Sequence, residues 1–547
     1  MTDQPSTETA PRGDLEFGTT PRLVQIAAER HGDAIAFEDE SDRTAISYRD
    51  FERRVVDAAR AFIAAGIEPG DRVAIWAPNI WEWPVLALGA HSAGAIVVPI
   101  NTRFKGAEAA YVLERSGAKV LATVTDFLDT DYVALLDAAC DRGSELRALQ
   151  TLVVVRGEPA QGTISFEDFL HVGKAVDEQV ARDRAAAVQP DDVSDILFTS
   201  GTTGHPKGVR TTHAQNLRAF RTWADVVGVR AGDRYLVINP FFHAFGYKAG
   251  ILASLMCGAT LLPHAVFDAA AVLDRIPRDR ISFLPGPPAI FQTILARDDL
   301  DAFDLSSLRL SVTGAAAIPV SMIIEMRERL GFETIVTGYG LTEVCGIATM
   351  CRHDDDPETI ATTSGRAIPG VEVICADERG KEVPRGEPGE ILVRGYNTML
   401  GYLDDDAETA ATIDPDGWLH SGDIGTMDER GYIKITDRTK DMFIVGGFNA
   451  YPAEIEAMML QHPAIAAAAV VGVPDERLGE VGWAYVVLRD GAAATGDELR
   501  NWCKETMANY KAPRRVEIVD ALPLNATGKV LKYELRARAE RDRASQA

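Results

Sequence analysis

Residues 195–209 of the chain read DILFTSGTTGHPKGV. Ile196, Leu197 and Phe198 predict a buried strand, and the glycines after it let the backbone turn tightly and present N–H groups to an anion. Gly208 follows the lysine, so the loop is not the GxxxxGK(S/T) motif of P-loop NTPases. The sequence therefore predicts a different phosphate-binding loop, made by Thr199, Ser200, Gly201, Thr202, Thr203, Gly204 and Lys207.

Short β-branched runs alternate with helical patterns through most of the chain. The runs are RVAIWAP (72–78), AIVVPIN (95–101), KVLATV (119–124) and TLVVV (151–155), and residues 48–66 show a helical period. Strands that alternate with helices are typical of α/β folds with largely parallel sheets. We therefore expect such a fold around the phosphate loop.

The pattern of apolar and polar residues changes near residue 437. The polar stretch DRTKD (437–441) is followed by a glycine pair, a helix that opens at YPAEIE, and two more apolar runs. We expect a large domain over residues 16–437 and a small, separate domain over 438–547. Residues 1–15 are polar and are expected to form a disordered tail.

The composition of the chain limits which ligands it can bind and where in the cell it is expected. The chain has 547 residues and a net charge of 56 − 81 = −25, which disfavours nucleic acids and anionic membranes. Its longest apolar stretch, residues 84–100, is broken by glycine, histidine and proline, so we expect a buried helix and strand there and no membrane span. Six scattered cysteines and the absence of a signal-peptide pattern favour a cytoplasmic protein.

The phosphate loop resembles the signature loop of the adenylate-forming enzymes, which include acyl-CoA synthetases, luciferases and the adenylation domains of peptide synthetases. Their other motifs follow in the expected order, so the resemblance covers nearly the whole chain from about residue 20. It implies a large N-terminal domain of mixed α/β subdomains and a small, mobile α+β C-terminal domain. It also implies that the ligands are ATP, Mg²⁺, coenzyme A and a small-molecule carboxylic acid.

The resemblance implies a nucleotide site assembled from several motifs. Tyr339 would stack on adenine, Thr342 would hold the α-phosphate, and Glu343 would bind Mg²⁺, although Thr-Glu is also a helix-start signal. Asp423 would bind the ribose, and Lys529 would reach the reacting carboxylate and the α-phosphate. The resemblance also implies a hinge between the two domains at about 437–441. The remaining motif residues are Gly314, Ala315 and Ala316 beside adenine, Arg438 and Lys440 in the hinge, and Gly446 and Gly447 along the pantetheine arm.

A run of aromatic residues around His243 resembles the motif that borders the acyl pocket, where this histidine would gate the passage to coenzyme A. A lone histidine in such a run is more often a packed core residue. Peptide-synthetase domains carry aspartate at this position, so His243 argues against an amino-acid substrate. The predicted pocket residues are Phe242, Phe245, Gly246, Tyr247, Gly286 and Gly338.

The identity of the acid follows only from resemblance. DVSDILFTSGTTG, NPFFHAFGYKAGILA and YGLTEVCGIATMCR are similar to actinobacterial acyl-CoA synthetases of steroid breakdown, in particular those acting on an indanedione propanoate. A medium-chain fatty acid or an aryl acid is the alternative. A luciferase-like oxidation, a silent binding module and an adenylation enzyme that loads a carrier protein are further alternatives, and a homodimer is left open.

Overall fold

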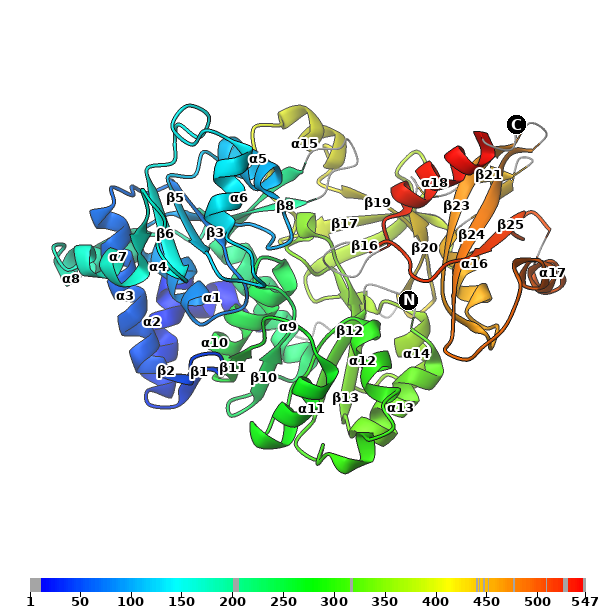
Figure 1. The fold of residues 1–547 in the computed structure, drawn as a ribbon, viewed down its shortest axis with the longest axis horizontal. Coiled ribbons are helices and arrows are strands. Elements are labelled where there is room, and N and C mark those ends of the chain that lie inside the picture. Colours follow the sequence, from blue (N-terminus) through cyan, green and yellow to red (C-terminus); the bar gives the residue numbers. More distant parts are fainter. Residues whose placement is uncertain are drawn as a thin grey trace, which may run out of the picture.

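The strand that leads into the phosphate loop lies inside an eight-stranded sheet of the computed structural model (Figure 1). The structure describes residues 11–199, 206–314, 318–438, 441, 443–445, 448–450, 452–475, 478–507, 509–524 and 530–544. Within these residues the sheet has the order β18-β9-β8-β4-β3-β5-β6-β7. Its strands are β3 Arg72–Trp76, β4 Ile96–Pro99, β5 Val120–Val124, β6 Thr151–Arg156, β7 Ile164–Ser165, β8 Val193–Thr199, β9 Lys207–Thr212 and β18 Gly401–Tyr402.

Six strands of this sheet, from β8 to β7, run parallel, and only β9 and β18 are antiparallel to their neighbours. The chain moves from β3 to β4 and then returns past β3 to β5, so right-handed crossovers place α4 and α5 on opposite faces. Each predicted strand run and the predicted 48–66 helix is present. The helices of this region are α1 Gly13–Phe17, α2 Thr20–His31, α3 Tyr48–Ala64, α4 Glu82–Ser92, α5 Gly106–Ser116, α6 Tyr132–Ala139, α7 Phe166–Gly173 and α8 Glu178–Ala187.

Two four-stranded sheets lie beside the first and meet at Phe283, which bridges Tyr235 on one side and Leu310 on the other. The first contains β1 Ile35–Asp39, β2 Thr44–Ser47, β10 Arg234–Val237 and β11 Thr260–Pro263, and the second contains β12 Leu310–Gly314, β13 Thr334–Tyr339, β14 Thr349–Met350 and β15 Arg366–Ala367. Their helices are α9 His213–Val227, the π-helix η1 Phe245–Leu252, α10 Ala253–Cys257, α11 Ala269–Arg278, α12 Pro288–Leu295, the 3₁₀ turns η2 Leu300–Ala302 and η3 Thr342–Val344, α13 Val320–Leu330 and α14 Pro357–Thr362.

An antiparallel sheet of order β16-β17-β19-β20 completes the large lobe. Its elements are β16 Val371–Ala376, β17 Gly389–Gly395, α15 Asp406–Thr412, β19 Leu419–Met427 and β20 Ile433–Arg438. The largest apolar core of the described residues runs from Phe17 to Ile433, so all four sheets share one interior.

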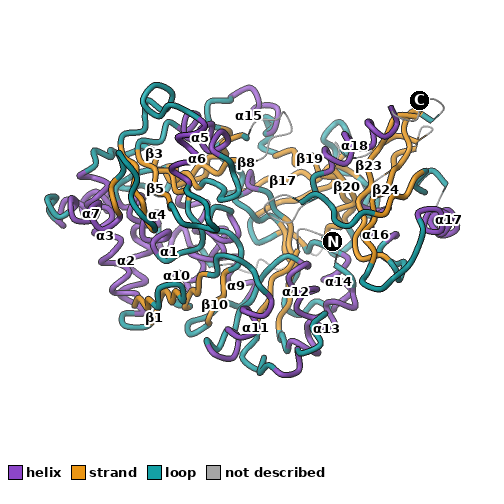
Figure 2. Tube along the Cα trace, viewed as in Figure 1, coloured by secondary structure: helices purple, strands orange, loops and turns teal. Residues whose placement is uncertain are grey.

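The elements after β20 form a smaller lobe at the right of Figure 1, and Figure 2 shows its strands side by side. This lobe contains β21 Phe443–Val445, β22 Phe448–Ala450, α16 Pro452–Met459, β23 Ile465–Asp475, β24 Gly479–Leu488, α17 Gly496–Thr506, β25 Arg515–Ile518 and α18 Lys532–Ala544. It has its own apolar cores, which begin at Phe443. A large lobe of mixed α/β sheets and a small α+β lobe are the fold class that the sequence predicted.

The apolar stretch at 84–100 forms most of α4 and then β4, as predicted, and every residue of α4 is buried. Among the residues that the structure describes, every helix is too short or too polar to cross a membrane.

One buried histidine ties α4 to the main sheet. The Nε2 atom of His91 lies 2.8 Å from the Ser194 carbonyl oxygen of β8, and its Nδ1 atom lies 2.8 Å from the Thr20 hydroxyl. Burial lowers the pKa of His91 from 6.5 to about 4. The folded protein therefore keeps this ring neutral at pH values where the unfolded chain protonates it.

This pKa shift predicts a loss of stability in mild acid. Because the unfolded chain binds the His91 proton below about pH 6.5, the stabilisation is complete above that pH and is lost as the pH falls toward 4. Between pH 7.5 and 5.5 the loss is about 1.4 kcal/mol. We expect the destabilisation caused by His91→Gln to shrink by this amount over the same range in urea unfolding. The matched substitution His353→Gln, at an exposed site, serves as control, and a pH-independent difference for His91→Gln would contradict the assignment.

Candidate active site

The predicted phosphate loop connects two paired strands, β8 and β9. Thr199 at the end of β8 is the register partner of Lys207 at the start of β9. The loops after β4 and β5 lie at the same edge of the sheet, because these strands are parallel to β8. In open α/β sheets this carboxyl edge is where ligands bind. A capping box between Thr212 and Gln215 ends β9 and starts α9.

Lys207 and Glu343 are linked through an aromatic side chain. The Lys207 ammonium contacts the Glu408 carboxylate of α15 and lies 5.2 Å from the centre of the Tyr402 ring. The Tyr402 hydroxyl donates a hydrogen bond of 3.0 Å to Glu343 Oε1. Burial and the neighbouring Glu343 carboxylate raise the pKa of Tyr402 well above its ordinary value. The hydroxyl is therefore a stable donor that orients the predicted Mg²⁺ ligand.

The predicted adenine and ribose residues are also in contact. The Tyr339 hydroxyl donates a 2.7 Å hydrogen bond to Asp423 Oδ2, and both side chains are buried. Arg438 is the strand partner of Asp423 in the pairing of β19 with β20. Gly314 ends β12 with φ 154° and is the register partner of Gly338 in β13. The contact between Tyr339 and Asp423 thus joins segments that are 84 positions apart in the sequence.

His243 lies two residues before the start of the π-helix η1. Its side chain has exposed surface, yet desolvation by the surrounding protein, followed by the charge of Lys248, lowers the pKa of its imidazole. Phe242 and Phe245 flank His243 and are half-buried, and the Phe245 ring lies 6.1 Å from the Trp223 ring in an edge-on arrangement.

Other predicted pocket residues serve the packing of the pocket wall. Tyr247 is fully buried and packs 5.3 Å from the Trp83 ring, so it belongs to the core behind η1 and has no surface for a ligand. A Cβ atom on Gly246 would lie 2.1 Å from the Pro240 carbonyl oxygen, and one on Gly338 would lie 2.7 Å from the Thr349 carbonyl oxygen. On Gly286 it would lie 2.9 Å from the Ile290 side chain. These glycines make room for neighbouring protein atoms.

Several predicted residues lie outside the described residues. They are Ser200, Gly201, Thr202, Thr203, Gly204, Ala315, Ala316, Lys440, Gly446, Gly447 and Lys529. Their roles stay predictions.

Comparison with known proteins identifies the family. The AMP-binding enzyme family matches residues 24–403, and the C-terminal domain of AMP-binding enzymes matches residues 454–529. The chain belongs to the AMP-binding enzymes. This assignment confirms the family that the sequence motifs indicated.

Two relatives among the AMP-binding enzymes carry the same name, 3-[(3aS,4S,7aS)-7a-methyl-1,5-dioxo-octahydro-1H-inden-4-yl]propanoyl:CoA ligase. The protein from Rhodococcus jostii RHA1 is 48% identical over 98% of this chain and 99% of its own length. The protein from Mycobacterium tuberculosis H37Rv is 52% identical over 88% of this chain and 92% of its own length. A solved anthranilate CoA ligase in complex with anthranoyl-AMP aligns with TM-score 0.87 and 28% identity, over 98% of this chain and all of that one.

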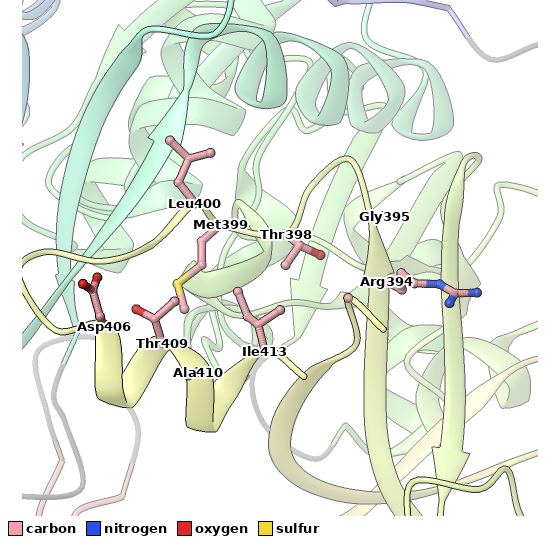
Figure 3. Close-up of a pocket in the computed structure, with 10 residues that line it drawn as sticks. Arg394, Gly395, Thr398, Met399, Leu400, Asp406, Thr409, Ala410 and Ile413 are labelled. Atoms are coloured by element: carbon pink, nitrogen blue, oxygen red, sulfur yellow. The ribbon is translucent and has the colours of Figure 1, made fainter. Parts of the chain in front are cut away.

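A separate groove of about 750 Å³ lies between α15 and β17. Figure 3 shows Met399 and Ile413 pointing into it, with Arg394 at one end. It contains none of the predicted site residues, although the Met399 amide donates to the Glu343 carbonyl oxygen at 2.8 Å. The groove therefore lies beside the segment that carries Glu343.

Sequence reasoning missed Tyr402 and Glu408, the two side chains that hold Lys207 and Glu343. Tyr402 lies 59 positions from Glu343, and Glu408 lies 201 positions from Lys207. No local spacing could bring these residues together, since the contacts depend on β18 adding to the edge of β9.

The close approach at Gly246 gives a testable packing prediction. Gly246→Ala places a Cβ atom against the Pro240 backbone and should lower the free energy of unfolding by about 1–3 kcal/mol. Gly250→Ala, in the same helix, meets the two Val237 methyl groups at 3.3 and 3.5 Å and the Phe245 carbonyl oxygen at 3.9 Å, so it should cost much less. Both variants gain the same helix preference of alanine over glycine. The difference between their free energies of unfolding in urea therefore measures the steric clash at residue 246. Equal effects would contradict the described approach of η1 to residue 240.

Proposed function

We propose that this AMP-binding enzyme is an acyl-CoA ligase that activates the indanedione propanoate named in its two relatives. The proposal is supported by two sets of contacts, which link Lys207 through Tyr402 to Glu343 and join Tyr339 to Asp423. The relatives at 48% and 52% identity support the choice of acid. The half-buried Phe242 and Phe245 suit its apolar fused rings.

The first half-reaction joins the acid to AMP. A carboxylate oxygen of the acid attacks the α-phosphorus of ATP, and the bond from that phosphorus to pyrophosphate breaks. The transition state spreads negative charge over phosphoryl oxygens. We assign its stabilisation to Lys207, the amides of the glycine loop, the Thr342 hydroxyl and Lys529. Tyr339 and Asp423 would hold the adenosine, which places both reactants in line.

Glu343 fits the role of a Mg²⁺ ligand. Its carboxylate is half-buried and oriented by the Tyr402 hydroxyl. One carboxylate is sufficient because Mg²⁺ usually keeps several waters and binds substrate phosphates. The ion would neutralise charge on the phosphate oxygens.

The second half-reaction transfers the acyl group to coenzyme A. The thiolate attacks the acyl carbon, the bond from that carbon to the AMP oxygen breaks, and the thiol proton passes to solvent. Lys529 and the Gly446–Gly447 segment would serve the two half-reactions in turn, through rotation of the small lobe about the hinge at residues 437–441. His243, kept neutral by its surroundings, would border the passage between acyl and thiol sites.

The proposal is tested with purified protein, ATP, Mg²⁺ and coenzyme A, and a panel containing the indanedione propanoate, medium-chain fatty acids and aryl acids. We expect thioester and AMP in equal amounts, with the highest kcat/KM for the indanedione propanoate. A higher kcat/KM for a fatty or aryl acid would reassign the substrate. AMP formation without thioester would point to carrier-protein loading or oxidation of the adenylate, and no AMP with any acid would overturn the proposal.

The two half-reactions can be separated at Lys529. We expect Lys529→Ala to slow adenylate formation about a hundredfold, as expected for the loss of one partner of the transition-state charge. Thioester formation from presynthesised adenylate should remain close to the wild-type rate. Lys504→Ala, at an exposed position of α17 in the same lobe, is the control. Equal slowing of both steps by Lys529→Ala would refute the two-orientation scheme.

A further inference from the structure

A fully buried ion pair lies behind the candidate active site. The Lys248 ammonium and Asp195 Oδ1 are 3.0 Å apart, and neither side chain has exposed surface. Burying two charges is costly, and such pairs persist where their geometry is good and the remaining hydrogen-bonding capacity is used. A pair of this kind is weak evidence for stability alone, so its location decides what it does.

The Asp195 carboxylate is saturated with donors. Oδ1 accepts from the Thr211 hydroxyl at 2.8 Å as well as from Lys248, and Oδ2 accepts from the Ser194 hydroxyl at 2.7 Å and the Asn216 amide at 2.6 Å. Lys248 also donates to the Thr211 hydroxyl at 3.0 Å. Because Asp195 and Thr211 are register partners, the network sits across the β8–β9 hairpin that carries the glycine loop.

Lys248 connects this hairpin to the acyl side of the site. It lies five positions after His243 in the π-helix η1, which also contains Phe245. π-helical turns are rare and occur frequently at functional sites. Seven of the eight residues of η1 are buried, and Lys248 ties this buried segment directly to the β8–β9 hairpin.

The segment that follows Glu343 also packs close to this ion pair. Burial raises the pKa of the Cys345 thiol to about 12, with Lys248 and Asp195 as the charges acting on it. A Cβ atom on Gly346 would lie 3.0 Å from Ala244, which directly precedes η1. Three ligand-bearing segments thus pack around one ion pair: the β8–β9 hairpin, η1 and the turn after Glu343.

We propose that Lys248 and Asp195 are a positioning pair that fixes η1, and with it His243 and Phe245, against the hairpin of the phosphate loop. This inference rests on the proposed function, because it assigns the acid site to η1. Neither side chain touches a ligand, since neither is exposed. The hairpin is held on both sides by β4 and β18, so loss of the pair displaces η1 and the acid site rather than the nucleotide loop.

The decisive variant is the double substitution Asp195→Asn with Lys248→Met, which removes both charges together and leaves no unpaired buried ion. Removing both charges together avoids the large loss of stability that follows when one buried charge is left unpaired. The matched control is Asp233→Asn with Arg309→Met. That pair is also largely buried, at 2.6 Å, but it joins the amino ends of β10 and β12.

Two readouts are expected to change only in the Asp195/Lys248 variant. The KM for the acid should rise at least tenfold while the KM for ATP stays within threefold, and amides of residues 243–252 should exchange with deuterium at least tenfold faster. The control pair should change neither readout. Either an unchanged KM for the acid or unchanged exchange at 243–252 overturns the inference. If the wild-type protein forms no thioester, the proposed function fails separately, and the exchange comparison still decides whether the pair fixes η1.

Discussion

A chain with net charge −25 repels a nucleoside triphosphate over most of its surface. It can hold one only where cations and backbone amides are concentrated enough to overcome this repulsion. The structure meets this constraint at the end of the β8–β9 hairpin. Lys207 is held there by Glu408 and the Tyr402 ring, and Tyr402 in turn orients Glu343. Each charge has a neighbour that fixes it before a ligand arrives, so little reorganisation remains for the reaction itself.

The same hairpin also holds the acid side of the site, through contacts in the protein interior. Asp195, in the strand before the loop, anchors η1 through Lys248, and the Cys345 turn packs against both. In this proposal the loop that joins β8 to β9 serves the nucleotide, and the buried Asp195 in β8 serves the acid pocket. This arrangement explains why one sheet edge can align two reactants that approach from different sides.

Sequence reasoning predicted the elements that local patterns encode. The strand runs, the helix at residues 48–66, the split into a large and a small lobe and the family all agree with the structure and the comparisons. It could not predict contacts made across the sheet, such as Tyr402 with Glu343, or the burial of Tyr247. Nor did it explain the glycines of the pocket, where Gly246 is required by the approach of the Pro240 backbone. These features depend on tertiary packing, which no local spacing contains.

The central claim is that the acid's own oxygen attacks the α-phosphorus. It is tested most directly by incubating the enzyme with ATP, Mg²⁺, coenzyme A and the indanedione propanoate labelled with ¹⁸O in its carboxyl group, followed by mass spectrometry of the products. The account predicts one ¹⁸O atom in AMP and none in pyrophosphate. Label in inorganic phosphate with ADP as the nucleotide product, or unlabelled AMP, would contradict it.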